Sequence, residues 1–160
     1  MNGALVAAAE SLLADCRARK LKIATAESCT GGLIAATLTE IAGSSDVVER
    51  GFVTYSNEAK MELLGVPTGA LESHGAVSAE IARAMVEGAL ARSRADIAVA
   101  VTGIAGPTGG SAAKPVGLVH FAAQRRGQAP VLRHDIFPGG RSDVRRATVG
   151  KAFELLRGLL

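Results

Sequence analysis

Five consecutive residues with small or reactive side chains follow the first strand-like apolar segment of the chain: Ser28, Cys29, Thr30, Gly31 and Gly32. Apolar residues recur at helical spacing directly after them, so they lie at a strand-to-helix corner. Backbone N–H groups at such a corner can bind a phosphate or the oxyanion of an acyl-transfer intermediate. Glycines there let a ligand approach the backbone closely, although tight packing of the helix on the sheet would explain them equally well.

Ser28 and Cys29 are both candidate nucleophiles. A thiol at a helix start can have a lowered pKa, but no histidine lies near Cys29 in the sequence. Ser28 lies in neither a G-x-S-x-G nor an S-x-x-K motif, so its base must come from elsewhere in the chain. Lys60 is a candidate, because burial can lower a lysine pKa by up to ~3–5 units and a neutral amine can deprotonate serine. Taken alone, Lys60 is more typical of a solvated helix lysine.

Several other kinds of site are excluded by their missing motifs. The chain has no GxxxxGK[ST] loop, no GxGxxG fingerprint and no HExxH motif. Its two cysteines form no CxxC pair, and its three histidines are scattered, so we expect neither a metal nor another cofactor. From the residues alone, the prediction is a small-molecule site at glycine-rich loops, with hydrolase chemistry as one option.

Composition and charge narrow the class of protein. Eighteen Lys and Arg against fifteen Asp and Glu give a net charge of +3, and aromatic residues make up only 3%. This charge is too small, and the aromatics too few, to predict nucleic-acid binding. The N-terminus lacks the pattern of a signal peptide, and no apolar run reaches membrane-spanning length. We therefore expect a cytoplasmic protein without a membrane partner.

Hydrophobic periodicity predicts the elements that position the corner. Five strands are expected, over 21–26, 46–56 with an interruption at Gly51, 96–103, 116–124 and 130–137. Helices are expected over 5–16, 34–42, 57–65 and 78–93, and a last helix follows the segment 138–140. Gly43 is expected to end the second helix, and a turn is expected at Val66-Pro67.

This alternation predicts a three-layer α/β/α sandwich that forms a single domain over residues 1–160. The last two strands are joined by a short turn, so the sheet of about five strands should be mixed, although mostly parallel. Sites in such folds lie beyond the carboxyl ends of the strands. The glycine-rich loops 27–32 and 102–110 should therefore open on the same edge of the sheet.

Five motifs occur in an order and spacing that closely resemble the C-terminal domain of the CinA (competence/damage-inducible) family. They are TAESCTGG, VTYSNEAK, HGAVS, VAVTGIAGP and KPVGLVHFA. The resemblance runs from about residue 5 to the last helix. Stand-alone members of this family are nicotinamide-nucleotide amidohydrolases. The resemblance implies hydrolysis of the carboxamide of nicotinamide mononucleotide, which yields nicotinate mononucleotide and ammonia.

The resemblance also implies roles for residues at matching positions. Ser28 is the expected nucleophile, Lys60 the general base, and Tyr55 the hydroxyl that relays or orients the proton. Backbone donors near Ser28 would stabilise an oxyanion, and other groups would hold the 5′-phosphate. The expected substrate-binding residues are Thr30, Gly31, Gly32, Thr102, Gly103, Gly106 and Arg141.

The chain departs from the family pattern at two positions. Thr108 stands where the glycine loop often reads GPGGG, and Gly140 stands where the family often shows the Asp of GDR. Two other functions stay open: a non-catalytic nucleotide-binding or regulatory module, and a thiol hydrolase that uses Cys29. The resemblance also suggests a homodimer.

Overall fold

The computed structural model describes residues 2–160. Its strands are β1 (Ile23–Glu27), β2 (Val48–Val53), β3 (Ile97–Gly103), β4 (Leu118–Arg125) and β5 (Val131–Ile136). Its α-helices are α1 (Gly3–Ala18), α2 (Leu33–Thr39), α3 (Asn57–Leu64), α4 (Thr68–His74), α5 (Ala79–Ala91) and α6 (Arg141–Arg157), and a 3₁₀ turn, η1, spans Ser44–Asp46.

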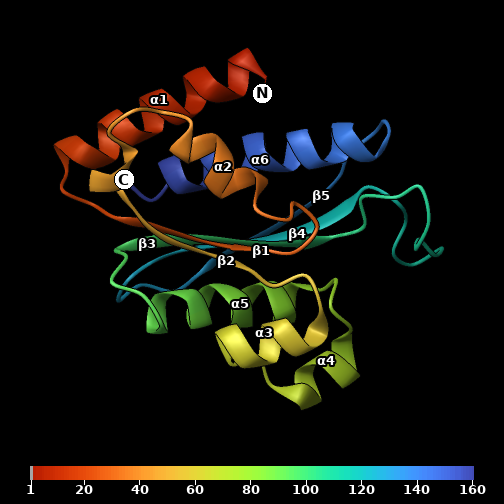
Figure 1. The fold of residues 1–160 in the computed structure, drawn as a ribbon. Coiled ribbons are helices and arrows are strands. Elements are labelled where there is room, and N and C mark those ends of the chain that lie inside the picture. The colour runs from red at the N-terminus through yellow and green to blue at the C-terminus, as the bar shows by residue number, and fades with distance from the viewer. Residues whose placement is uncertain (1) are drawn as a thin grey trace.

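The five strands form one mixed sheet in the order β2-β1-β3-β4-β5. β1 pairs in parallel with β2 and β3, whereas β4 is antiparallel to both β3 and β5. Four of the five strands therefore run in one direction. Helices α1, α2 and α6 cover one face of the sheet, and α3, α4 and α5 cover the other (Figure 1). The predicted three-layer α/β fold is confirmed.

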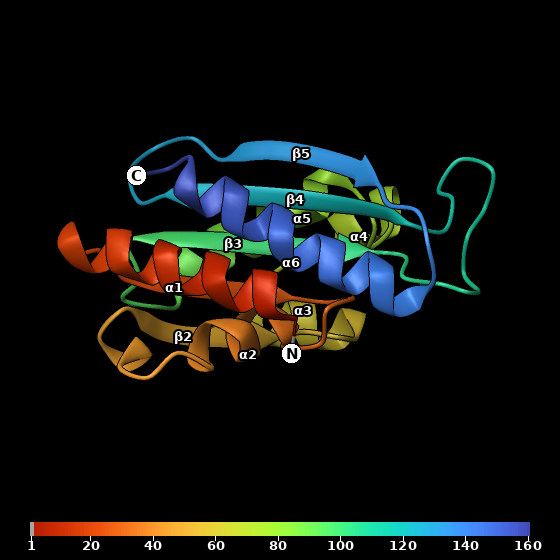
Figure 2. The same cartoon turned by 90° about the horizontal axis from the view of Figure 1, so that it is seen from above.

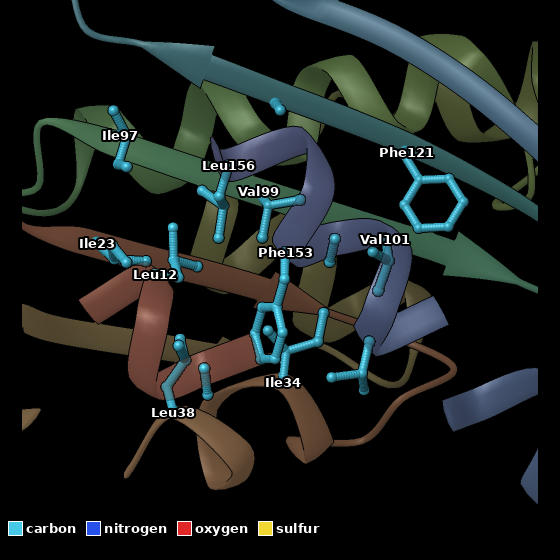
Figure 3. Close-up of a cluster of buried hydrophobic side chains, with 14 of the residues drawn as sticks. Leu12, Ile23, Ile34, Leu38, Ile97, Val99, Val101, Phe121, Phe153 and Leu156 are labelled. Atoms are coloured by element: carbon cyan, nitrogen blue, oxygen red, sulfur yellow. The ribbon is translucent and has the colours of Figure 1, made fainter. Parts of the chain in front are cut away.

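Alternate residues of the central strand β3 face the two helical layers, as the twofold side-chain period of a strand requires. Ile97, Val99 and Val101 belong to the core under α1, α2 and α6, whereas Ala98 and Ala100 belong to the core over α5. Larger side chains fill the first core, where Leu12, Ile34, Phe153 and Leu156 gather above the sheet (Figure 3). Alanines in the second core let α5 approach the sheet closely.

The predictions for the end of the second helix and for the second strand were wrong in part. The second helix ends at Thr39, so Ile41 and Ala42 lie in the connection that leads to the η1 turn. β2 covers only Val48–Val53 and passes through Gly51 without the expected interruption. The register irregularity lies instead next to Ile23, where β1 pairs with β2. A Cβ at Gly51 would lie 2.9 Å from Thr25 Oγ1, so glycine makes room there for the neighbouring strand.

The layer formed by α3, α4 and α5 contains one helix that the sequence analysis missed. α4 begins directly after Pro67, where only a turn was predicted. α3 packs on α5 at Gly88, whose Cβ would stand 2.0 Å from the backbone oxygen of Leu64. This close approach fixes α3 over the sheet, and α3 carries Lys60.

The two glycine-rich loops open on one edge of the sheet, as predicted. Glu27, at the end of β1, lies opposite Val101 of β3, so the loops that follow these strands start side by side. The loop between β3 and β4 extends beyond this edge, and α6 begins there as well (Figure 2). Within residues 2–160, no helix is both long and apolar enough to span a bilayer.

Candidate active site

Ser28 and Lys60 meet at this edge of the sheet. The Nζ atom of Lys60 lies 3.0 Å from the Oγ atom of Ser28. It also donates to the backbone oxygen of Thr54 at 2.8 Å and to that of Tyr55 at 3.4 Å. Ser28 directly follows β1, and Lys60 lies on α3, whose first residues are capped by the Ser56 hydroxyl. The parallel strands β1 and β2 therefore deliver the two residues to one place.

Lys60 is one of the largest fully buried side chains among the described residues, with 1% of its surface exposed. Burial lowers the pKa of this amine below its ordinary value, because the charged form loses its hydration. Its three partners are two carbonyls and a hydroxyl, so no carboxylate among residues 2–160 contacts it to hold the charge. The surroundings of Lys60 therefore favour the neutral amine.

A cavity of about 220 Å³ adjoins this pair. We call it the Ser28 cavity; six of the residues predicted for the site line it: Ser28, Tyr55, Lys60, Thr102, Gly103 and Arg141. The other lining residues are Cys29, Asn57, Ala76, Val77 and Ala105. Thr30, Gly31, Gly32 and Gly106, which were also predicted, are not among the lining residues that the structure describes.

Tyr55 and Arg141 form the outer part of the Ser28 cavity. The Arg141 guanidinium donates to the Tyr55 hydroxyl at 3.0 Å and to the backbone oxygen of Gly106 at 2.9 Å. The Tyr55 side chain is 62% exposed, and the contact of this residue with Lys60 runs through its backbone oxygen. The structure thus groups the tyrosine hydroxyl with the arginine rather than with the Ser28–Lys60 pair.

The backbone conformation explains why two glycines stand between Ser28 and α2. Gly31 and Gly32 both have positive φ values, of 58° and 102°, which favour glycine because it has no Cβ. They precede α2 rather than forming its first turn. The Gly31 N–H donates to the Ser28 carbonyl at 3.0 Å, so that amide is already engaged. The Thr30 N–H has no hydrogen-bond acceptor within residues 2–160.

Glu27 is a residue of the site that the sequence analysis missed. Its fully buried carboxylate accepts from the Thr30 hydroxyl at 2.7 Å and from the backbone N–H groups of Ile34 and Ala35 at 2.9 and 3.0 Å. It therefore satisfies the first amides of α2 and turns the Thr30 side chain away from the Ser28 cavity. The available signal was a single carboxylate at the end of an otherwise uncharged buried strand.

Cys29 is poorly suited to act as a nucleophile. Burial raises the pKa of its thiol to about 11, because the thiolate would lose its hydration. The thiol is therefore protonated at neutral pH, which argues against the thiol-hydrolase hypothesis.

The predicted site residue Thr102 and the position of departure, Gly140, both have clear structural contacts. The buried Thr102 hydroxyl donates to the backbone oxygen of Ala76 at 2.8 Å, which ties the end of β3 to the connection before α5. At the start of α6, where the family often has Asp, the Gly140 N–H donates to the Asp143 carboxylate at 2.9 Å. Asp143, three residues later in the chain, thus supplies an acidic group at this turn.

No group of three His, Cys, Asp or Glu residues placed to hold a metal ion occurs in the described part of the chain.

A model of the CinA C-terminal domain family matches residues 5–160. The CinA-like protein of Mycolicibacterium vanbaalenii is 57% identical over 138 residues, which cover 86% of this chain and 33% of that protein. The CinA-like protein of Mycolicibacterium paratuberculosis is 54% identical over 143 residues, which cover 87% of this chain and 33% of that protein. The chain thus spans about a third of the length of these curated relatives.

Solved structures match the whole fold. The crystal structure of the competence/damage inducible protein CihA from Agrobacterium tumefaciens superposes with a TM-score of 0.97 at 53% identity, covering 99% of this chain and 97% of that one. A CinA superfamily protein from Escherichia coli superposes with a TM-score of 0.93 at 34% identity, covering 100% of this chain and 94% of that one. By sequence and by structure, the chain belongs to the CinA C-terminal domain family.

Proposed function

We propose that the protein hydrolyses the carboxamide of nicotinamide mononucleotide to nicotinate mononucleotide and ammonia. The observation that carries this proposal is the distance of 3.0 Å between the Nζ atom of a buried lysine, Lys60, and the Oγ atom of Ser28. A serine next to a neutral amine has the partner that it needs to become a nucleophile. The resemblance to family members that act on this nucleotide supplies the substrate.

The hydrogen-bond partners of Lys60 suit the neutral form. A neutral amine has two N–H groups and one lone pair. The carbonyls of Thr54 and Tyr55 can only accept, so they take the two N–H groups. The lone pair is then left for the proton of the Ser28 hydroxyl. This arrangement makes Lys60 a general base without any histidine.

The reaction follows in two stages. Lys60 takes the Ser28 proton while Oγ forms a bond to the carboxamide carbon. The C–N bond then breaks, and the protonated Lys60 gives its proton to the leaving nitrogen, which departs as ammonia. In the second stage, Lys60 takes a proton from a water molecule whose oxygen bonds to the acyl carbon. The bond from that carbon to Oγ then breaks, Lys60 returns the proton to Ser28, and the acid product leaves as a carboxylate after giving its proton to solvent.

An amide is a poor electrophile, so the negative charge that develops on its oxygen needs a donor. The Thr30 N–H lies two residues after the nucleophile and has no acceptor in the described chain, which makes it the donor we assign. One such donor is worth about 2.7–4 kcal/mol of barrier in enzymes of this kind. Gly31 does not serve in this role in our proposal, because its N–H is bonded to Ser28.

The nucleotide phosphate needs cationic and N–H donors, which we assign to the outer part of the Ser28 cavity. Arg141 lies there at the N-terminus of α6, next to the loop that contains Gly103 and Gly106. A guanidinium can bind a phosphate through two parallel hydrogen bonds. We assign the Tyr55 hydroxyl, which contacts Arg141, to orienting the substrate between this group and Ser28.

The direct test is incubation of the protein with nicotinamide mononucleotide, with ammonia and the deamidated nucleotide measured separately. We expect both products in equal amounts. Some relatives are named for competence or damage induction, so a nucleotide-binding module without catalysis is the second candidate. It predicts a higher melting temperature in the presence of the nucleotide but no ammonia, and that result would reject the amidohydrolase.

A further inference from the structure

Arg145 reaches from α6 to the loop that carries Ser28. Its Nε atom donates to the backbone oxygen of Cys29 at 3.2 Å, and its Nη2 atom donates to that of Thr30 at 2.9 Å. Arg145 does not line the Ser28 cavity. It lines a separate cavity of about 480 Å³ bounded by α1, α2 and α6. The loop therefore has the candidate nucleophile's cavity on one side and a guanidinium on the other.

The contacts of Arg145 fix the direction of a peptide N–H. In a planar trans peptide group, the N–H and the C=O point in opposite directions. Since the Cys29 carbonyl points to Arg145, the Thr30 N–H of the same peptide group points away from it. Cys29, which supplies the carbonyl of this peptide group, lines the Ser28 cavity. This amide has no acceptor among the described residues, and neither has the amide of Gly32 at the start of α2.

The geometry points to Arg145 as a positioning residue for amide hydrolysis, one that holds the Thr30 N–H in place for the oxyanion; this inference rests on the proposed function. The rigid fork of the guanidinium binds two successive carbonyls and so holds two peptide planes. Its charge also polarises these peptide groups, which strengthens their N–H groups as donors. Donors that are already oriented stabilise the transition state without a cost of reorganisation, so Arg145 acts on kcat and leaves substrate affinity unchanged.

The first experiment compares Arg145→Ala with Arg146→Ala. Arg146 is the next residue of α6, is exposed, and its side chain pairs with Asp143 instead of the loop. We expect kcat of Arg145→Ala to fall about 10- to 100-fold with KM changed less than about two-fold, whereas Arg146→Ala keeps both constants. A role confined to folding would lower the melting temperature and leave the kcat of the folded fraction unchanged.

Rescue by a small cation separates positioning from general destabilisation. Arg145 is partly exposed, and its cavity is bordered by the exposed Ser142 and Arg146, so it opens to solvent. Guanidinium ions at a low, non-denaturing concentration can then enter the space that Arg145→Ala vacates. They should restore part of the lost kcat in this variant and leave Arg146→Ala unaffected. Arg145→Lys, which keeps the charge but loses the fork, should have an intermediate kcat and provides a second variant if the alanine variant does not fold.

Labelling of Ser28 by a fluorophosphonate gives a readout that does not depend on the natural substrate. The Ser28 Oγ–P bond forms, the P–F bond breaks, fluoride leaves and the serine proton goes to Lys60. The phosphoryl oxygen then occupies the position of the oxyanion. Intact-mass measurement should show slower labelling of Arg145→Ala than of the unsubstituted protein, with recovery when guanidinium is added.

The outcomes keep the two proposals apart. Normal ammonia release from the unsubstituted protein, with an equal kcat and labelling rate in Arg145→Ala, would overturn the role of Arg145 and leave the amidohydrolase intact. An absence of ammonia release would reject the proposed function, and the labelling rates would then decide on Arg145. If the unsubstituted protein is neither active nor labelled, both proposals fail.

Discussion

The Nζ atom of Lys60 lies 3.0 Å from the Oγ atom of Ser28, although 32 residues separate them in the sequence. The contact depends on the parallel pairing of β1 with β2, which brings the ends of these strands side by side. Ser28 directly follows β1, and Lys60 lies on α3, the helix that follows β2. The amine is buried and has carbonyls as its other partners. The mechanism proposed above depends on this contact.

Replacing Lys60 with methionine should abolish amide hydrolysis while the protein stays folded. Methionine has a similar length and no charge to bury, so the core remains filled. The carbonyls of Thr54 and Tyr55 lose a donor, and leaving such groups unsatisfied costs about 1–3 kcal/mol each. Urea unfolding and an ammonia assay check both parts. A Lys60→Met variant with normal turnover would remove lysine from the mechanism.

The pH dependence of stability should report the titration of Lys60. In the unfolded chain this group titrates at about 10.4, and burial lowers its pKa in the folded protein. Between the two pKa values the unfolded chain binds more protons, so the free energy of unfolding rises with pH across this window. The cost of burying the charged form is fully present below the folded-state pKa.

Lys60→Met lacks this titration and serves as the control. Urea unfolding from about pH 7 to about pH 10 should show the unsubstituted protein gaining stability relative to the variant. kcat/KM should rise as the pH passes the lowered pKa of Lys60 in the folded protein and then level off, because only the neutral amine accepts the serine proton. Parallel stability curves for the two proteins would show that the pKa of Lys60 is not lowered.

Arg141→Met should weaken binding of the substrate phosphate and leave the rate of the chemical step largely unchanged. The substitution removes the guanidinium that contacts Tyr55 and the Gly106 carbonyl. Hydrogen bonds to charged groups are worth about 1.5–3 kcal/mol, so KM for nicotinamide mononucleotide should rise roughly 10- to 100-fold. The riboside, which has no phosphate, should be affected much less. An equal loss with both compounds would place the role of Arg141 elsewhere.

Glu27→Gln should destabilise the protein by about 2 kcal/mol or more, as expected when a buried hydrogen bond to a charged group is lost. The carboxylate accepts from two hydroxyls and two backbone amides, whereas a glutamine amide brings N–H groups to the same donors. Glu40→Gln is the matched control, because Glu40 is exposed just beyond α2. Urea unfolding of both variants checks the difference. Equal stability of the two variants would show that Glu27 does not hold the corner.

Local patterns were sufficient to predict the layers and the convergence of the two loops. Alternating strands and helices have few ways to cover a sheet, and parallel neighbours end on the same edge. The prediction that the second helix continues beyond Thr39 to Ala42 was wrong, because Gly43 precedes the η1 turn instead of capping α2. α4 was missed because its seven residues carry too short a pattern for periodicity to indicate a helix.

The candidate site was less predictable than the fold. Residue types alone left both Ser28 and Cys29 open, and it was the burial of Cys29 that argued against the thiol. Glu27 and Arg145 could not be recognised, because their roles depend on contacts made only in the folded chain. The roles of Tyr55 and Arg141 in the reaction stay predictions.

Ammonia release from nicotinamide mononucleotide by Ser28→Ala and by Cys29→Ala, measured side by side, tests the mechanism most directly. We expect no ammonia from Ser28→Ala, which should fold normally. Cys29→Ala should keep turnover within about ten-fold of the unsubstituted protein, because the thiol that it removes is protonated at neutral pH. Turnover by Ser28→Ala at the unsubstituted rate would contradict the assignment of the serine as the nucleophile.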